Sequence, residues 1–446
     1  MAVTLEHPES VNAIEDGDLS SRVAAEAYVG GVCFKLGPPT LIGAELEWLT
    51  VQGECSTSGR SAAPRPQLAA LTEALGPYAP RSIAPDSPAL SLPGGSRVTI
   101  EPGGQIELSS APFAAAAQLC EGLRTDTRML RDLLESRSIR TVSAAADADR
   151  RPKRVLRLPR YRAMEESFGG IGPFGKLMMC NTAATQVSVD AGADRAEVTA
   201  RWTALYTIGP ALLAAFACSP ALRGAPAGDW ASQRWRTWMR LDHTRTRPPV
   251  DAWPDPIADY GRWALDVPLL CVRRPRAQHQ DDAAENGHGD EGWSAPPGAS
   301  FADWLSGALD DEVDRRPDID DLDYHLTTLF PPVRASGHLE IRYLDAQPDD
   351  DWAVPIHVVD ALMSSPAVVA EATRVAAPLA SQWLHAARHG LADPQIRSIA
   401  IELLTLAEAH AATPAAAVEI GRALRRCQSG RTPIDEPVSD DSGTRS

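Results

Sequence analysis

The feature that most constrains the fold of this chain is a set of four segments in which apolar and polar residues alternate. The segments cover residues 41–50, 97–110, 183–192 and 337–345. Alternation with a period of two is typical of strands with one buried face. The regions between them do not repeat a strand–helix–strand order, so we predict an α+β protein built on a largely antiparallel sheet.

Helical periodicity occupies much of the remaining chain. We predict helices over 114–137, 195–208 and 300–309, and two or three packed helices in the Ala-rich part 355–426. The most apolar stretch, 204–218, contains a Gly-Pro pair and is too short to cross a bilayer. It is therefore expected to be a buried helix.

Three polar segments suggest how the chain is divided. Residues 1–18 and 430–446 are predicted to be disordered, and 277–296 is predicted to be a flexible acidic insertion. The remainder, 19–429, is expected to form a single domain.

Charge and cysteine usage exclude several classes of protein. The 446 residues carry a formal net charge of -16, which argues against nucleic acid and against an anionic membrane surface as partners. The seven cysteines are scattered, without any CxxC pair, so neither a disulfide framework nor a structural zinc site is expected. The N-terminus lacks the pattern of a secretory signal, and we expect a cytoplasmic protein.

The polar faces of the four segments are rich in carboxylates and contain no lysine. Residues two apart on a strand share a face. The residues grouped in this way are Glu45 with Glu47; Glu101, Gln105 and Glu107, provided that Pro102–Gly104 adds no bulge; Gln186 with Ser188 and Asp190; and His338, Glu340 and Arg342.

Carboxylates gathered on one sheet destabilise it unless cations neutralise them. Oxygen ligands without histidine and cysteine clusters suit Mg²⁺ or Mn²⁺. Arg334 and Arg342 near these carboxylates point to a site for nucleotide phosphates. The alternative is an ordinary solvated sheet face, which is the usual meaning of a single Glu-x-Glu pair, with a simple glycine turn at 102–104. The chain has neither a P-loop nor a GxGxxG motif after a strand.

Several ordered motifs resemble those of glutamate–cysteine ligases of the plant and bacterial type. They read GAELE, EPGGQIELSSAP, MMCNTAATQVSVD and HLTTLFPPVRASGHLEIRYLD, and the resemblance covers about residues 40–365. Within that family the chain is most similar to the actinobacterial branch that supplies γ-glutamylcysteine for ergothioneine synthesis.

This resemblance implies a glutamine-synthetase-like fold, in which a curved, largely antiparallel sheet forms an active-site funnel flanked by helices. It also implies that ATP, L-glutamate and L-cysteine are the substrates, and that γ-glutamylcysteine, ADP and phosphate are formed through γ-glutamyl phosphate. A monomer or a weak homodimer is expected.

The resemblance also assigns roles to residues. Arg342 would contact phosphate, and Arg334 would hold a carboxylate of glutamate or a phosphate. The metal ligands for Mg²⁺ or Mn²⁺ would be Glu45, Glu47, Glu107 and Glu340, with Glu101 as a further candidate. Contacts to substrate or ATP are expected from Gln105, Gln186 and Tyr161.

Some of these assignments leave alternatives open. Gln186 lies where related ligases can place a histidine metal ligand. Tyr161 belongs to a basic run, 150–162, which either approaches the ATP phosphates or is a solvated loop. His325 and His338 have no assigned role. The Trp/Arg cluster at 230–248 suggests helix packing or a lid over an anionic substrate.

Two other functions remain possible at this point. The first is another carboxylate–amine ligase, or a phosphotransferase on the same fold that acts on a guanidino or carboxylate group. The second is a sheet protein without catalysis, against which the retained carboxylates argue.

Overall fold

The structure, a computed structural model, describes residues 19, 21–53, 63–84, 87–247, 253–273 and 293–435. The predicted disorder at 1–18, most of the acidic insertion and the end of the predicted C-terminal tail therefore lie outside the described residues. The first part of that tail ends in a short 3₁₀ helix, Pro433–Asp435.

A seven-stranded sheet forms the centre of the molecule, and all of its named strand pairs are antiparallel. The strand order is β2-β3-β1-β5-β7-β6, with β4 paired to β1. The strands are β1 (Ile42–Gln52), β2 (Arg97–Ile100), β3 (Ile106–Ser109), β4 (Ile139–Val142), β5 (Ala184–Val189), β6 (Val333–Ala335) and β7 (Leu339–Asp345). The predicted α+β class with an antiparallel sheet is confirmed.

Strand β1 shows why the alternation predicts the sheet. Ala44, Leu46 and Trp48 are buried on one face, while Glu45 and Glu47 on the other face are only partly covered. Side chains of successive residues point to opposite faces of a strand. The apolar face of β1 therefore joins the core, and its carboxylates lie on the face that holds the site.

The segment 97–110 is a hairpin and not the single strand that a continuous period of two would give. A turn after β2 reverses the chain, so that Glu101 N–H donates to the carbonyl of Gln105 at 2.9 Å. A Cβ on Gly103 would lie 2.3 Å from the carbonyl oxygen of Cys180, and Gly104 has a φ of +85°. These two glycines permit the tight turn and its close approach to the neighbouring helix.

Strands β6 and β4 were not predicted. Arg334, expected in a turn, lies in β6 and pairs directly with Glu340 of β7. The pairing of β5 with β7 shifts register between Thr185 and Val187, where three steps along β7 match two along β5. This bulge lies next to Arg342, and bulges commonly re-aim side chains near functional sites.

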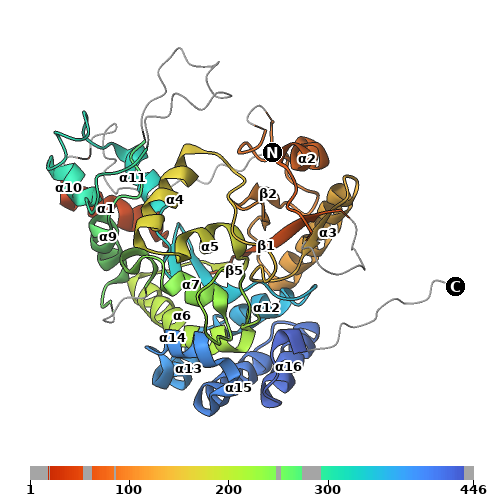
Figure 1. The fold of residues 1–446 in the computed structure, drawn as a ribbon. Helices are drawn as coiled ribbons and strands as arrows, with labels where there is room; N and C mark the ends of the chain where they lie inside the picture. The colour runs from red at the N-terminus through yellow and green to blue at the C-terminus, as the bar shows by residue number, and fades with distance from the viewer. Residues whose placement is uncertain are drawn as a thin grey trace, which may run out of the picture.

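Helices enclose the sheet on both faces (Figure 1). The α-helices are α1 (Arg22–Cys33), α2 (Leu68–Leu75), α3 (Ala116–Glu135), α4 (Pro159–Ile171), α5 (Phe174–Asn181), α6 (Arg195–Phe216), α7 (Gln233–Met239), α8 (His243–Thr246), α9 (Pro256–Asp266), α10 (Phe301–Ser306), α11 (Ile319–Leu326), α12 (Ala353–Leu362), α13 (Pro366–Ala376), α14 (Trp383–His389), α15 (Pro394–Ala409) and α16 (Pro414–Gln428). Further 3₁₀ turns are η1 (Gly76–Tyr78), η2 (Ala377–Leu379) and η3 (Gly390–Ala392).

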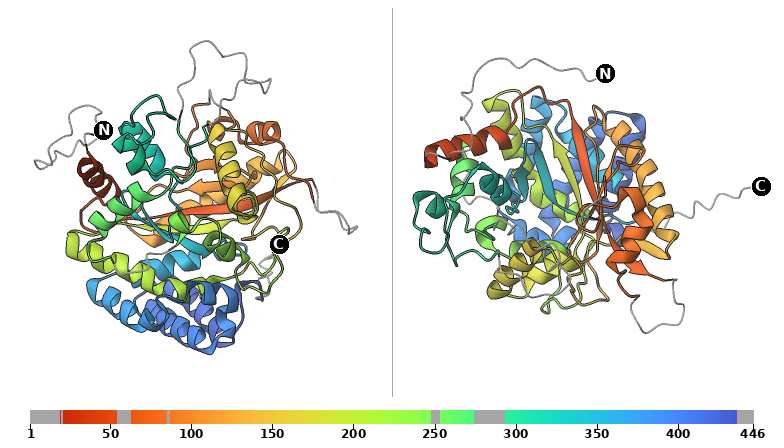
Figure 2. Two further views of the ribbon diagram at one scale, coloured as in Figure 1. Left: turned by 60° about the vertical axis from the view of Figure 1, so that its left-hand side comes forward. Right: turned by 90° about the horizontal axis from the view of Figure 1, so that it is seen from above.

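The two faces of the sheet have different partners. Helix α6 packs on β7, α12 on β5 and α3 on β1, and together they cover the apolar face. The left view in Figure 2 shows the strands between the blue C-terminal helices and the yellow helix α4. The site described below lies between the polar face of the sheet and α4, α5 and α7.

Helix α6 combines two predicted helical segments, because the pattern over 195–208 continues without a break into the apolar stretch after it. It begins at Asp194, whose side chain accepts the N–H of Glu197, and nearly all of its later residues are buried. A helix that is apolar on every side belongs in a core.

The C-terminal part contains more helices than expected. Five α-helices, α12 to α16, occupy the region where two or three were predicted. Among the described residues, no single helix has the length and composition to cross a membrane; only α12 together with 366–379 passes as a pair, and that pair is bent by 107°. All six cysteines within the described ranges are buried, and those at positions 33, 120, 180, 218 and 271 are free thiols.

Candidate active site

A cavity of about 220 Å³ opens on the polar face of the sheet. Its wall is formed by side chains from strands, helices and the turn before β6. The lining residues are Glu45, Glu47, Glu101, Pro102, Gln105, Glu107, Arg160, Tyr161, Met164, Met178, Met179, Thr182, Gln186, Arg234, Trp238, Thr327, Phe330, Arg334 and Arg342. All the predicted site residues except Glu340 are on this wall.

Four carboxylates form one side of the cavity. Glu47 of β1 lies directly opposite Glu107 of β3, and Glu45 lies opposite Gln186 of β5. Glu101 enters from the end of β2, where the hairpin turn brings it to the same cavity. The turn therefore gathers the carboxylates that the sequence had placed on one straight strand.

Burial and mutual repulsion perturb these groups. Burial, reinforced by Glu107, raises the pKa of Glu45 and of Glu47 well above the ordinary value for a glutamate. Burial followed by the charge of Glu101 raises the pKa of Glu107 to about 7, against hydrogen bonds from Thr99 and Ser109 that lower it. The carboxylates on this wall therefore resist ionisation together, and a bound cation would favour their charged forms.

Such a wall suits a hard divalent cation. In the described part of the chain, no three side chains of His, Cys, Asp or Glu converge on a single point. Mg²⁺ needs no such cage, because it is usually held by one or two carboxylates together with substrate phosphates. The donor set of oxygen atoms on one cavity wall therefore fits Mg²⁺ or Mn²⁺ carried with a nucleotide.

Two amides complete the carboxylate side. Gln186 Nε2 donates to Glu45 Oε2 at 2.7 Å, and Gln105 Nε2 donates to the carbonyl of Thr182 at 2.9 Å. The Oε1 atom of each amide is buried and has no hydrogen-bond partner among the described residues. A buried acceptor without a partner is costly, so both oxygens are available to a cation or to a donor on a substrate.

The opposite side of the cavity carries arginines. Arg334 and Arg342 both form ion pairs with Glu340, the Arg334 contact measuring 2.7 Å. Glu340 is 1% exposed and lies behind the two guanidinium groups, outside the cavity wall. Burial opposes its ionisation, but Arg334 and then Arg342 outweigh burial and lower the pKa of Glu340. In this geometry Glu340 holds the guanidinium groups of Arg334 and Arg342 side by side.

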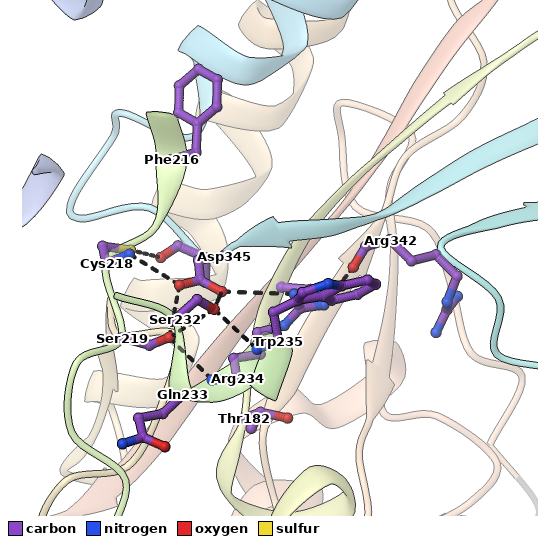
Figure 3. A network of polar contacts seen from close by, with 12 residues as sticks. Thr182, Phe216, Cys218, Ser219, Ser232, Gln233, Arg234, Trp235, Arg342 and Asp345 are labelled. Carbon is purple, nitrogen blue, oxygen red and sulfur yellow. Dashed lines mark hydrogen bonds and ion pairs between the residues drawn. The ribbon is translucent and has the colours of Figure 1, made fainter. Parts of the chain in front are cut away.

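A third arginine, Arg234, was not predicted as a site residue. It lies near the start of α7, which is capped by Ser232, and it is 2% exposed (Figure 3). Its Nη2 donates to the carbonyl of Arg342 at 2.7 Å, and its guanidinium carbon lies 5.6 Å from the ring centre of Trp238. Arg342 contacts the same ring at 5.4 Å, so Trp238 fixes both cations.

Helices α4 and α5 supply the last part of the wall. Arg160 binds Thr327 through Oγ1 at 2.6 Å and through the carbonyl at 2.8 Å. Tyr161 is in the first turn of α4 and faces the cavity, so the predicted basic run ends in a helix and not in a solvated loop. Burial raises the pKa of Tyr161, which keeps its hydroxyl protonated and able to donate. Arg160 was missed because its place depends on how α4 docks.

The two unassigned histidines have structural positions. His325 is buried, and its Nε2 lies 2.8 Å from the carbonyl oxygen of Ala264. His338 precedes β7 and contacts Ser336 at 3.3 Å. Neither histidine lines the cavity.

Comparisons with known proteins agree on one family. The family model for glutamate–cysteine ligase family 2 (GCS2) matches residues 41–444. The chain is 34% identical over 423 residues to glutamate–cysteine ligase EgtA of Mycolicibacterium smegmatis, covering 94% of this chain and 91% of that protein. It is 35% identical over 400 residues to EgtA of Mycobacterium tuberculosis H37Rv, with 89% and 85% covered.

More distant similarities extend the same picture. The chloroplastic glutamate–cysteine ligase of Medicago truncatula is 29% identical over 259 residues, which is 57% of this chain and 48% of that protein. Among solved structures, the glutamate–cysteine ligase of Francisella tularensis in complex with AMP matches with a TM-score of 0.50 at 12% identity. It covers 89% of this chain and 84% of that one, and at this identity it shows a shared fold.

Proposed function

The chain belongs to glutamate–cysteine ligase family 2, and from that premise we propose that it joins L-glutamate to L-cysteine at the expense of ATP. The products are γ-glutamylcysteine, ADP and phosphate. Because its relatives of high coverage are actinobacterial EgtA proteins, we also propose that the product enters ergothioneine synthesis.

One observation carries the proposal. A single cavity brings four carboxylates on β1 and the β2–β3 hairpin to face arginines from α4, α7 and the β6–β7 hairpin. Phosphoryl transfer between two anions needs this combination, because catalysis there is mostly charge neutralisation and positioning.

The reaction divides into two steps. An oxygen of the glutamate γ-carboxylate attacks the γ-phosphorus of ATP, and the bond to the bridging oxygen breaks to release ADP. The amine of cysteine then attacks the acyl carbon of γ-glutamyl phosphate, loses a proton and expels phosphate. Closing both steps in one cavity protects the acyl phosphate from water.

We assign the arginines to the anionic groups. Arg342 contacts the transferred phosphoryl group, and Arg334 holds a carboxylate of glutamate or a phosphate. Arg234, on the same wall, offers a further cation for either class of anion. Glu340 fixes Arg334 and Arg342 before substrate arrives. Trp238 likewise contacts the guanidinium groups of Arg234 and Arg342.

We assign the carboxylates to the cation. Mg²⁺ or Mn²⁺ held by these residues would offset the negative charge of the phosphates and so lower the repulsion of the anionic nucleophile. Its ligands would be chosen from Glu45, Glu47, Glu101 and Glu107, which line the cavity. Glu340 would have to exchange an arginine contact for the cation in order to serve as a ligand.

The other substrate contacts, the domain bounds, the compartment and the oligomeric state are proposals of the same kind. Gln105, Gln186 and Tyr161 contact substrate or ATP, since all three face the cavity. We propose one catalytic domain over 19–429, acting in the cytoplasm as a monomer or a weak homodimer. The free, buried thiols of Cys33, Cys120, Cys180, Cys218 and Cys271 support a reducing compartment.

The test is ADP release by the purified protein with Mg²⁺, ATP and glutamate, with and without cysteine. We expect cysteine to accelerate ADP release and mass spectrometry to detect γ-glutamylcysteine. Alanine replaces cysteine as a matched amine without the thiol.

Each other outcome rejects part of the proposal. Equal ADP release without any amine identifies a carboxylate phosphotransferase. Equal use of alanine identifies a ligase with a different amine substrate.

A further inference from the structure

A buried network lies behind the arginine side of the cavity, and none of its carboxylate or hydroxyl groups lines the cavity itself (Figure 3). At its centre is Asp345, the last residue of β7, which is 0% exposed. Asp345 Oδ2 accepts the Cys218 N–H at 3.0 Å and the Ser219 hydroxyl at 2.7 Å. Its Oδ1 accepts the Ser232 hydroxyl at 2.9 Å.

The network reaches the cavity through Arg234. The Nη1 atom of Arg234 lies 3.8 Å from Asp345 Oδ1, and it has no hydrogen-bond partner among the described residues. The backbone is held as well, since Arg234 N–H donates to Ser219 Oγ at 3.2 Å. Ser232 caps α7 by accepting the Trp235 N–H at 3.0 Å. Side chain and backbone of Arg234 are therefore tied to one carboxylate.

The charge of Asp345 has a specific use in this position. Burial lowers the pKa of Arg234, and the charges of Asp345 and then Glu47 oppose that loss. Glu47 faces the cavity, where a cation is expected, whereas Asp345 lies behind the wall. Of these two carboxylates, Asp345 is the one that can favour the charged form of Arg234 without occupying the cavity.

We propose that Asp345 is a positioning residue, which orients Arg234 so that its guanidinium binds an anionic group of a substrate, a carboxylate or a phosphate. The inference rests on the proposed function. It goes beyond that function by assigning the Cys218–Ser219–Ser232–Asp345 cluster to substrate affinity and not only to the stability of the core. Outer partners of metal ligands commonly change affinity or activity by roughly 10–100-fold, and we expect an effect of similar size for this partner of an arginine.

The first test is Asp345→Asn, which keeps the shape and removes the charge. Its carbonyl can accept from Cys218 N–H, and its amide can donate to Ser232, whose hydroxyl rotates to accept. We expect KM for one anionic substrate (glutamate, cysteine or ATP) to rise at least tenfold, with kcat and the other two KM values within about threefold. The three KM measurements identify whether the anion is a carboxylate or a phosphate.

A matched control uses a second buried carboxylate. Asp126 is 0% exposed and accepts the N–H groups of Gly94 and Ser96 at 2.6 and 2.9 Å, and it does not line the cavity. Asp126→Asn is expected to lower Tm and to leave all three KM values unchanged. A general loss of packing would move both variants alike.

Action through Arg234 is tested by a double-mutant cycle. Arg234→Lys is expected to raise the same KM. Adding Asp345→Asn to this variant should change that KM by less than about threefold, because lysine has no planar guanidinium for Asp345 to orient. Additive effects of the two substitutions would overturn the inference. If Asp345→Asn does not fold, Ser219→Ala replaces it, with a smaller rise in the same KM expected.

Failure of the two proposals can be told apart. An inactive wild-type protein rejects the proposed function. An active wild-type protein whose three KM values are unchanged in Asp345→Asn, or are all raised to the same extent, rejects the positioning role alone.

Discussion

Replacing Glu107 by glutamine should stabilise the metal-free protein while it removes activity. Glu107 is 8% exposed and lies directly across from Glu47. Both the Thr99 and the Ser109 hydroxyl donate to the same oxygen, Oε1, at 2.5 and 3.2 Å. Glutamine has an oxygen for these two bonds, so Glu107→Gln removes the charge and leaves the hydrogen bonding in place.

The magnitude follows from the raised pKa. The pKa of Glu107 is about 7 in the folded protein against 4.5 for an ordinary glutamate. The folded state thus binds the proton more tightly, and stability falls as pH rises from 4.5 to 7. At pH 8 the charged carboxylate costs about 3 kcal/mol, since one pKa unit corresponds to about 1.4 kcal/mol. Glu107→Gln should recover most of this free energy at pH 8 and less than about 1 kcal/mol at pH 5.

The assay is urea unfolding in EDTA at pH 8 and pH 5, with Glu121→Gln on the exposed face of α3 as the control. The control should stay within about 0.5 kcal/mol of wild type. Added Mg²⁺ with ATP should stabilise wild type more than Glu107→Gln, because the variant lacks one of the proposed ligands. A variant no more stable than wild type at pH 8 would refute the idea that burial and neighbouring carboxylates raise the pKa of Glu107.

Three further outcomes are expected. Glu340→Gln should lower kcat at least a hundredfold and the free energy of unfolding by about 3 kcal/mol, because buried Arg342 and half-buried Arg334 lose the buried carboxylate that they share; a variant with near-normal turnover contradicts this. His325 has a pKa lowered to about 4 by burial, so the unfolded state takes up its proton first as pH falls below 6.5. Its share of stability should drop by about 2 kcal/mol between pH 7 and pH 5, and His325→Gln should flatten the pH dependence of urea midpoints accordingly. Gly103→Ala should cost about 1–3 kcal/mol by forcing the hairpin away from Cys180, whereas Gly170→Ala, with nothing within 4 Å, should be neutral or stabilising by thermal melts.

The strand-borne part of the site was predictable because alternation is a local property. Glu45 and Glu47 need only a period of two to share a face, and the same holds for Glu340 and Arg342. The predicted strand alternation over 97–110 does not continue past Glu101, because the chain reverses at Gly103 and Gly104. It could not show that Glu340 lies behind Arg334, because that requires the pairing of β6 with β7.

The helix-borne part was not predictable by the same means. Arg160 and Arg234 reach the cavity through the docking of α4 and α7, which depends on contacts between distant segments. A signal did exist for Arg234, since a serine N-cap followed by mixed Trp and Arg residues in an acidic chain indicates cations held inside the protein.

The pairing of Arg334 with Glu340 also bears on how the sheet finds its alignment. A slip of β6 by one residue would set Arg334 against Leu339 or Ile341, and its guanidinium would then lose Glu340 and face hydrocarbon. A one-residue slip exchanges the two faces of a strand, and an unpaired buried charge is strongly destabilising. The Arg334–Glu340 ion pair is therefore expected to favour the native register of β6 and β7 over a shifted one. Few molecules should fold with β6 in a shifted register, and variants that neutralise Arg334 or Glu340 should form more of them.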